Sequence, residues 1–179
     1  MPSTLETPRL LLVVPTASDA DEIFERYAGD PDVTRYVGWP RHRSVADTQA
    51  FLEFSAAEWS RSPAGPYLIR SREDGRLLGG TGLSCEAERI AMTGYVLARD
   101  AWGYGYATEA LHAMTKLSRA LDVRRLYAVC HPEHRASSRV LEKCGFTRVH
   151  DGSCRAEFPN LVSGVLQDAL RYERVLLDS

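Results

Sequence analysis

Apolar residues along the chain form two patterns. Some stand in short continuous runs, and others recur at every third or fourth position. The runs predict strands, and the recurrences predict amphipathic helices. We expect strands at Arg9 to Val14, Tyr67 to Arg70, Leu77 to Leu83, Ile90 to Leu97, Arg125 to Cys130 and Phe146 to His150. We expect helices after the caps Ser18 and Ser44, along Ala107 to Leu121, and at Ala136 to Lys143. The tail from Ala169 to Leu176 fits either a strand or a helix.

The order of these elements suggests a mixed sheet with helices. The three strands between Tyr67 and Leu97 follow one another closely, and the turn Glu73-Asp74-Gly75 joins the first two. This arrangement predicts an antiparallel meander. With 179 residues, the chain suits a single domain over 1–179 whose core needs no disulfides.

Composition and charge exclude several classes of protein. Hydrophobic residues make up 44% and charged residues 26%, which excludes an intrinsically disordered or collagen-like chain. The net charge of -2 does not favour binding to nucleic acid or to an anionic membrane. The longest apolar run, Leu10 to Val14, is too short to span a membrane, and the N-terminus lacks the pattern of a signal peptide. We therefore expect a cytoplasmic protein whose 4 cysteines are free thiols.

The segment from Trp102 to Ala107 is chemically the most informative. A helix that begins near Tyr106 presents N–H groups without intrahelical partners, and these groups favour an anion. Gly103 and Gly105 would let the backbone approach a phosphate closely. A Walker loop is absent from this segment, and the dinucleotide-binding pattern fails because Thr108 stands where a third glycine is needed. A tight turn between strand and helix is the alternative interpretation.

Four blocks of residues resemble the GNAT acetyltransferases, and in particular their ribosomal-protein acetyltransferase branch. The blocks are Glu6-Thr7-Pro8-Arg9-Leu10, Gly94-Tyr95-Val96-Leu97, Trp102-Gly103-Tyr104-Gly105-Tyr106-Ala107-Thr108-Glu109-Ala110, and His131 to Phe146. They occur in the family's order across nearly the whole chain. The resemblance implies an α+β fold, the GNAT fold, in which helices flank a mixed, mainly antiparallel twisted sheet of about six to seven strands. It also implies an acetyl-CoA-dependent N-acetyltransferase.

The resemblance further implies which residues bind the coenzyme. The backbone of Tyr95, Val96 and Leu97 would pair with the pantetheine arm like an added strand, and an amide there would face the thioester oxygen. The pyrophosphate would lie on the segment formed by Trp102, Gly103, Tyr104, Gly105, Tyr106, Ala107 and Thr108. Trp102 stands where the family usually has glutamine or arginine.

Ser137 and His134 are the candidates for direct action on the thioester. In related proteins a hydroxyl at the position of Ser137 is placed to hydrogen-bond the coenzyme sulfur and to protonate it. The alternative role of Ser137 is to satisfy amides at the start of a helix. His134 replaces the family's asparagine, can donate one hydrogen bond to pantetheine, and titrates near neutral pH. A histidine in a solvent-facing loop is the alternative for this residue.

The sequence leaves the identity of the general base open. Met92 stands where many relatives carry a glutamate, and a thioether cannot accept a proton. Glu86, Glu88 and His131 are further candidates, and each of them could instead be a surface or loop residue. A chain of water molecules, or an amine that arrives neutral, would also serve.

The leading hypothesis is transfer of an acetyl group to a primary amine by direct attack in a ternary complex. The acceptor would be a protein N-terminus or a small amine such as an aminoglycoside or a polyamine. A non-catalytic acyl-CoA binding or sensor module is the competing class, because Met92 replaces the strand glutamate. The spacing of Cys130, His131, His134 and Cys144 matches no zinc pattern, so we expect no metal. We expect a monomer or a homodimer with no nucleic-acid or membrane partner.

Overall fold

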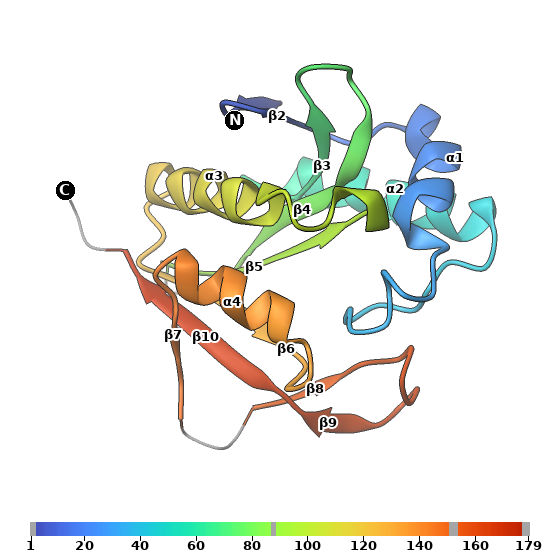
Figure 1. The fold of residues 1–179 in the computed structure, drawn as a ribbon. Helices are drawn as coiled ribbons and strands as arrows, with labels where there is room; N and C mark the ends of the chain where they lie inside the picture. Colours follow the sequence, from blue (N-terminus) through green and yellow to red (C-terminus); the bar gives the residue numbers. More distant parts are fainter. Residues whose placement is uncertain (1–2, 87–88, 151–153, 177–179) are drawn as a thin grey trace.

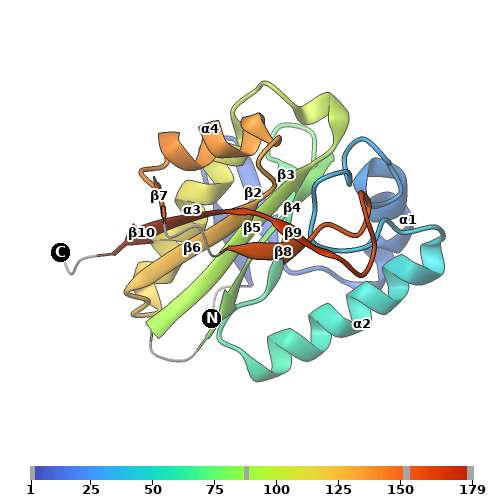
Figure 2. The same cartoon turned by 90° about the horizontal axis from the view of Figure 1, so that it is seen from below.

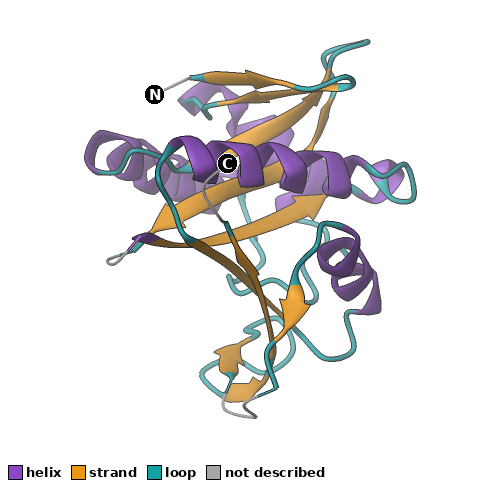
Figure 3. Cartoon of the chain, turned by 90° about the vertical axis from the view of Figure 1, so that its left-hand side faces the viewer, coloured by secondary structure: helices purple, strands orange, loops and turns teal. Residues whose placement is uncertain are grey.

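The computed structural model describes residues 3–86, 89–150 and 154–176, and an eight-stranded sheet lies at its centre (Figure 1). The strands lie in the order β1-β2-β3-β4-β5-β6-β10-β7. Their bounds are β1 Thr4–Glu6, β2 Leu10–Val13, β3 Pro66–Ser71, β4 Leu77–Cys85, β5 Ile90–Leu97, β6 Arg125–Cys130, β7 Thr147–Arg148 and β10 Leu170–Val175. Neighbouring strands are antiparallel except β5 and β6, which are parallel. A separate antiparallel pair, β8 (Arg155–Glu157) and β9 (Leu166–Asp168), extends beyond the main sheet (Figure 3).

The described residues form four α-helices, which cover both faces of the sheet. They are α1 Ala20–Ile23, α2 Val45–Arg61, α3 Tyr106–Ala120 and α4 Arg135–Lys143. A 3₁₀ turn, Ala17–Asp19, leads into α1, and a π-helical turn, Phe24–Ala28, continues it. Another 3₁₀ turn, Arg99–Ala101, follows β5. α3 and α4 lie on one face, and α1 and α2 lie on the other (Figure 2). None of these helices combines the length and the apolar character needed to cross a membrane, within the residues described.

Side chains of the strands alternate between two hydrophobic layers. On β3, Tyr67 packs in the layer that contains Leu111 and Met114 of α3. The next residue, Leu68, packs in the layer that contains Ile23 of α1. All five side chains are almost completely buried. Burial on both faces therefore holds the central strands in place.

Most of the expected elements are confirmed. β5 and β6 have the bounds that the apolar runs predict. α2 begins directly after its cap, Ser44. The tail is a strand rather than a helix, because β10 pairs with β6 from Leu170, opposite Cys130, to Val175, opposite Arg125. The mixed, mainly antiparallel sheet and the flanking helices confirm the expected fold class.

The number and length of the strands need correction. The main sheet has eight strands rather than six or seven, because the polar segment Thr4–Glu6 pairs with β2 and adds an edge strand. The strand expected over Phe146 to His150 is only Thr147–Arg148, because only these two residues pair in register with β10. β8 and β9 were not expected from the sequence.

The cap of the first helical segment is also different from the one expected. Thr16, rather than Ser18, occupies the N-cap position. The Thr16 amide donates a hydrogen bond of 2.7 Å to Oδ2 of Asp19, and the Thr16 hydroxyl donates one of 2.7 Å to the same oxygen. Ser18 Oγ lies 2.8 Å from the Thr16 hydroxyl and so supports the cap from outside. A threonine with an acidic residue three positions later forms a capping box, which explains the choice.

Candidate active site

β5 and β6 are parallel neighbours, but they stay paired only at their first residues. The pairs are Ile90 with Arg125, Ala91 with Leu126, and Met92 with Tyr127. Beyond Met92, β5 continues along β4, whereas β6 continues along β10. The two halves of the sheet separate from this point onward (Figure 1). Among the described residues, the second half of β5 therefore has a strand partner on one side only.

The open edge of β5 carries the backbone groups of Tyr95 and Leu97. The amide of Ala98 donates a hydrogen bond of 2.8 Å to the carbonyl of Leu78 on β4. The register of β4 with β5 is uninterrupted, and backbone groups alternate in direction along a strand. The N–H and C=O groups of Tyr95 and Leu97 therefore face away from β4, and those of Val96 face toward it.

The glycine loop lies beside the end of β5. Nε1 of Trp102 donates a hydrogen bond of 2.8 Å to the carbonyl of Leu97. Gly103 and Gly105 have φ values of +84° and +80°, which glycine adopts without steric cost. Gly105 is the N-cap residue of α3, so the first amides of that helix have no intrahelical partner. Together with the helix dipole, these amides form a site suited to an anion.

A pair of hydroxyl groups links β5 to α4 across the opening, which is the space where β5 and β6 separate. Oη of Tyr95 lies 3.0 Å from Oγ of Ser137 and donates a hydrogen bond of 3.1 Å to the Ser137 carbonyl. Ser137 is buried, and its hydroxyl pairs with Tyr95 rather than with an amide at the helix start. Burial raises the pKa of Tyr95, so its hydroxyl stays protonated at neutral pH. The sequence singled out the Tyr95 backbone but not this side chain.

Four aromatic rings gather where β6 ends and α4 begins. Tyr36 stacks on His131 with ring centroids 4.9 Å apart and on His134 with centroids 5.1 Å apart. Phe158 contacts His131 edge-on at 4.9 Å. Burial and the neighbouring His131 lower the pKa of His134, so its imidazole is neutral at pH 7. Tyr36 lies in a loop with no recognisable motif, and for this reason the sequence did not point to it.

The other candidate bases are engaged elsewhere. Nδ1 of His131 accepts a hydrogen bond of 3.2 Å from the Glu133 amide, so this nitrogen is already engaged. Oε1 of Glu86 accepts a hydrogen bond of 2.5 Å from the Tyr127 hydroxyl. Glu88 lies outside the described residues. No hydrogen bond to the His134 ring is formed within the described part of the chain, so this imidazole is available to a ligand.

The sheet face opposite α3 is accessible at Met92 and Gly94 of β5. Ala91 and Tyr95 pack in the α3 layer, so Met92 and Gly94 point to the opposite face. Met92 is 41% exposed, and a Cβ on Gly94 would meet no atom within 4 Å. Tyr127, the register partner of Met92, lies on the same face. An acceptor can therefore reach the open edge of β5 from this side.

Two loops border this face (Figure 2), and the side chain of Asn160 joins them. Asn160, between β8 and β9, accepts a hydrogen bond of 2.7 Å from the amide of Arg41. Its Nδ2 donates hydrogen bonds of 2.7 Å to the Thr34 carbonyl and 2.9 Å to the Trp39 carbonyl. The loop that follows α1 and the β8–β9 segment therefore form one structural unit.

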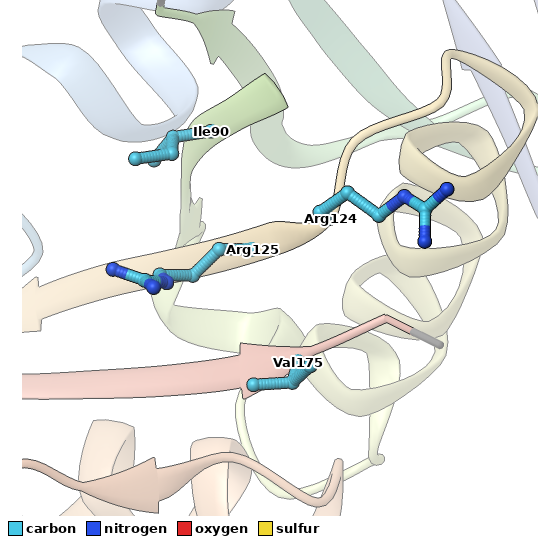
Figure 4. Close-up of a pocket in the computed structure, with 4 residues that line it drawn as sticks. All are labelled: Ile90, Arg124, Arg125 and Val175. Atoms are coloured by element: carbon cyan, nitrogen blue, oxygen red, sulfur yellow. The ribbon is translucent and has the colours of Figure 1, made fainter. Parts of the chain in front are cut away.

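A shallow pocket lies at the other end of the β5–β6 pair (Figure 4). Its lining residues are Ile90, Arg124, Arg125 and Val175. Ile90 and Arg125 are the first paired residues of β5 and β6. The pocket is therefore at the closed end of the pair, and the opening described above is at the other end.

The cysteines and histidines near α4 do not converge on one point. Within the described ranges, no three Cys, His, Asp or Glu side chains are placed to hold a metal ion. Sγ of Cys144 lies 3.6 Å from the Thr108 carbonyl and 3.9 Å from Nε2 of His112. Burial raises the pKa of the Cys130 and Cys144 thiols, so both stay protonated at neutral pH.

Comparisons with known proteins agree with this geometry. Residues 9–147 match the family model of the acetyltransferase (GNAT) domain. The uncharacterized N-acetyltransferase YoaA of Bacillus subtilis (strain 168) is 31% identical over 147 residues, which are 80% of this chain and 82% of the relative.

Two solved structures share the fold. The microcin C7 self-immunity acetyltransferase MccE, in complex with acetyl-CoA and AMP, has a TM-score of 0.83 at 21% identity over 98% of each chain. The ribosomal L7/L12 alpha-N-protein acetyltransferase RimL, in complex with coenzyme A, has a TM-score of 0.81 at 20% identity, over 97% of this chain and 98% of its own. The family match and the relative of 31% identity show that the chain belongs to the GNAT family of N-acetyltransferases.

Proposed function

We propose that the protein transfers an acetyl group from acetyl-CoA to a primary amine by direct attack in a ternary complex. The observation that carries this proposal is the open edge of β5, which presents the backbone of Tyr95 and Leu97 beside the Ser137 hydroxyl. A pantetheine arm contains amide groups and can pair with such an edge as a strand would. Its thioester would then lie between the two halves of the sheet.

The donor would be held at two places. The amides of Tyr95 and Leu97 would face the arm, whereas Val96 would not contribute, because its backbone groups face β4 and its side chain packs in the layer of Ile23. The pyrophosphate would lie against the amides from Gly103 to Thr108, at the N-terminus of α3. Trp102 holds the loop to the end of β5 through its bond to Leu97.

The chemistry requires one bond to form and one to break. The neutral amine nitrogen attacks the thioester carbon, an amide of the β5 edge stabilises the oxyanion, and the C–S bond breaks as the new C–N bond is completed. The departing thiolate takes a proton from the Ser137 hydroxyl, which regains one from solvent, while the contact with Tyr95 holds the Ser137 hydroxyl in place. The net result is an amide and free coenzyme A.

We assign His134 as the general base that accepts the proton of the attacking amine. Its imidazole is neutral at pH 7, is only partly buried, and makes no hydrogen bond within the described residues. His131 uses its acceptor nitrogen for a backbone amide, Glu86 accepts from Tyr127, and Met92 cannot accept a proton. The proton that His134 receives is later released to solvent.

The acceptor belongs to the class of protein N-termini or small amines. The RimL structure is that of an enzyme named for an N-terminal reaction on a ribosomal protein, and this supports the first class. The test is release of thiol from acetyl-CoA in the presence of peptide N-termini, a lysine peptide with a blocked N-terminus, a polyamine and an aminoglycoside. We expect turnover with one class of acceptor well above hydrolysis.

The competing function is a non-catalytic acyl-CoA sensor, which the exposed Met92 in place of a carboxylate favours. This function predicts binding of acetyl-CoA without thiol release for any amine in the panel. Such a result would overturn the proposed catalytic function and leave the coenzyme site in place.

A further inference from the structure

The N-terminal motif Glu6-Thr7-Pro8-Arg9-Leu10 lies beside the start of α3, although about a hundred residues separate the two in sequence. Glu109, in the first turn of α3, is the meeting point. Its Oε1 accepts hydrogen bonds of 2.6 Å from the Thr7 hydroxyl and 2.8 Å from the Arg9 amide. Its Oε2 accepts one of 2.7 Å from Nε of Arg9.

The same arginine also holds the glycine loop. Nη1 of Arg9 donates a hydrogen bond of 2.9 Å to the Tyr104 carbonyl. The guanidinium carbon lies 4.7 Å from the centroid of the Tyr106 ring, which is within the range of a cation–π contact. Nη2 lies 3.6 Å from the position that a Cβ on Gly105 would occupy. Arg9 therefore contacts three consecutive residues of the segment assigned to the pyrophosphate.

The electrostatics of Glu109 favour this arrangement. Burial alone would raise the pKa of Glu109, but the hydrogen bonds from Thr7 and Arg9 and the charge of Arg9 lower it. The carboxylate is thus ionised at neutral pH, and its side chain is only 15% exposed. An ionised, partly buried carboxylate with three donors fixes Arg9 in one geometry.

We infer that Arg9 is a positioning residue for the coenzyme pyrophosphate. It holds the carbonyl of Tyr104 so that the neighbouring amides stay turned toward the phosphates, and it brings a positive charge next to Gly105. A loop that is ordered before the ligand arrives binds it more tightly, because less conformational entropy is lost on binding. This inference rests on the proposed function of the glycine loop.

The test compares Arg9→Ala with Arg72→Ala. Arg72 is the matched control, because its Nη1 donates a hydrogen bond of 2.7 Å to the Thr7 carbonyl and none of its hydrogen bonds reaches the glycine loop. We expect Arg9→Ala to raise the KM and Kd for acetyl-CoA by about tenfold or more. We expect kcat and the KM for the amine to stay within about twofold of the wild-type values in Arg9→Ala. Arg72→Ala should resemble the wild type in all of these constants. Arg9→Lys, which keeps the charge but not the fork of donors, should restore part of the affinity.

A truncated donor separates positioning of the pyrophosphate from a general structural role. Acetyl-pantetheine carries the thioester arm without the pyrophosphate, so wild type and Arg9→Ala should use it with equal kcat/KM. An equal loss of kcat/KM with acetyl-CoA and with acetyl-pantetheine would overturn the inference. Unchanged affinity for acetyl-CoA in folded Arg9→Ala would overturn it as well. If Arg9→Ala does not fold, Arg9→Lys carries the same comparison. A wild-type protein that binds no acetyl-CoA would instead overturn the proposed function, and the inference with it.

Discussion

The hydroxyl of Tyr95 lies 3.0 Å from the hydroxyl of Ser137, and this contact joins a central strand to the helix across the opening of the sheet. Tyr95 also donates to the Ser137 carbonyl, which fixes the turn of α4 that carries the serine. The two residues therefore form a small unit in which Tyr95 orients the hydroxyl that we assign to the coenzyme sulfur.

Replacing Ser137 with alanine should lower kcat more than it changes the KM for acetyl-CoA. Protonation of the thiolate matters in the transition state and little in the ground state. We expect a loss in kcat of about tenfold, because a thiolate leaves fairly well unprotonated and water can replace the hydroxyl. Tyr95→Phe should have a smaller effect, and the double variant should lose less than the product of the two effects. A raised KM with unchanged kcat in Ser137→Ala would assign Ser137 to binding alone.

Gly105→Val should abolish most of the acetyl-CoA affinity. Gly105 has a φ of +80° and is the N-cap of α3, where a β-branched residue is strained and would displace the amides that we assign to the phosphate. Gly75→Val is the control, because Gly75 has a φ of +74° in the turn between β3 and β4. Thermal unfolding with and without acetyl-CoA measures both. A folded Gly105→Val protein that keeps the ligand-dependent rise in Tm would contradict the loop assignment.

The acidic limb of the pH profile should depend on His134. The base must be neutral to act, and the pKa of His134 is lowered from 6.5, so kcat/KM should fall as the pH drops below about 6.5. His134→Gln should remove this limb, and His131→Gln should keep it. If His134→Gln leaves the profile unchanged, the limb reports the acceptor itself, near 7.7 to 8.0 for an α-amine or 10.4 for a lysine.

Two glycines in the paired strands β4 and β5 should differ sharply when replaced with alanine. A Cβ on Gly79 would lie 2.0 Å from the Val96 carbonyl oxygen and 2.8 Å from Cα of Leu97. Gly79→Ala should therefore cost about 3 kcal/mol or more of unfolding free energy. Gly94→Ala should cost less than about 1 kcal/mol, because its Cβ meets open space, while it raises the KM for the amine. Urea unfolding checks the stabilities. Equal losses of unfolding free energy in the two variants would contradict the assignment of Gly94 to an accessible part of the sheet face.

Stability should decline as the pH falls below about 6.5 because of two histidines. Burial lowers the pKa of His42, although the charge of Asp47 acts to raise it. Nδ1 of His42 lies 2.8 Å from the Thr48 hydroxyl. The pKa of His134 is lowered as well. The unfolded chain then binds more protons than the folded one below about 6.5, so the unfolding free energy falls as the pH falls. His42→Asn should flatten this slope in urea titrations, and an unchanged slope would exclude His42 as a source.

Elements with a strong apolar run could be predicted from the sequence, and elements held by backbone pairing alone could not. β5 and β6 consist largely of apolar residues, and their bounds were predicted from these runs. Thr4–Glu6 and Arg155–Glu157 are short and polar, so only their register partners reveal them as strands.

The candidate site shows the same division. The glycines and Ser137 belong to local motifs and could be identified from neighbouring residues. The stack of Tyr36 on His134 and the bond from Arg9 to Tyr104 join residues that are about a hundred positions apart. No local pattern encodes such contacts, because the topology of the sheet creates them.

The separation of β5 from β6 also bears on how the protein avoids association with other chains. An unpaired strand edge at the border of a sheet invites a strand from another protein, which is a common start of aggregation. Here the unpaired edge at Tyr95 and Leu97 lies in the middle of the sheet, with β6 and α4 on its far side. Because β6 and α4 lie on its far side, this edge is not exposed at the border of the sheet, where a strand of another chain could add to it.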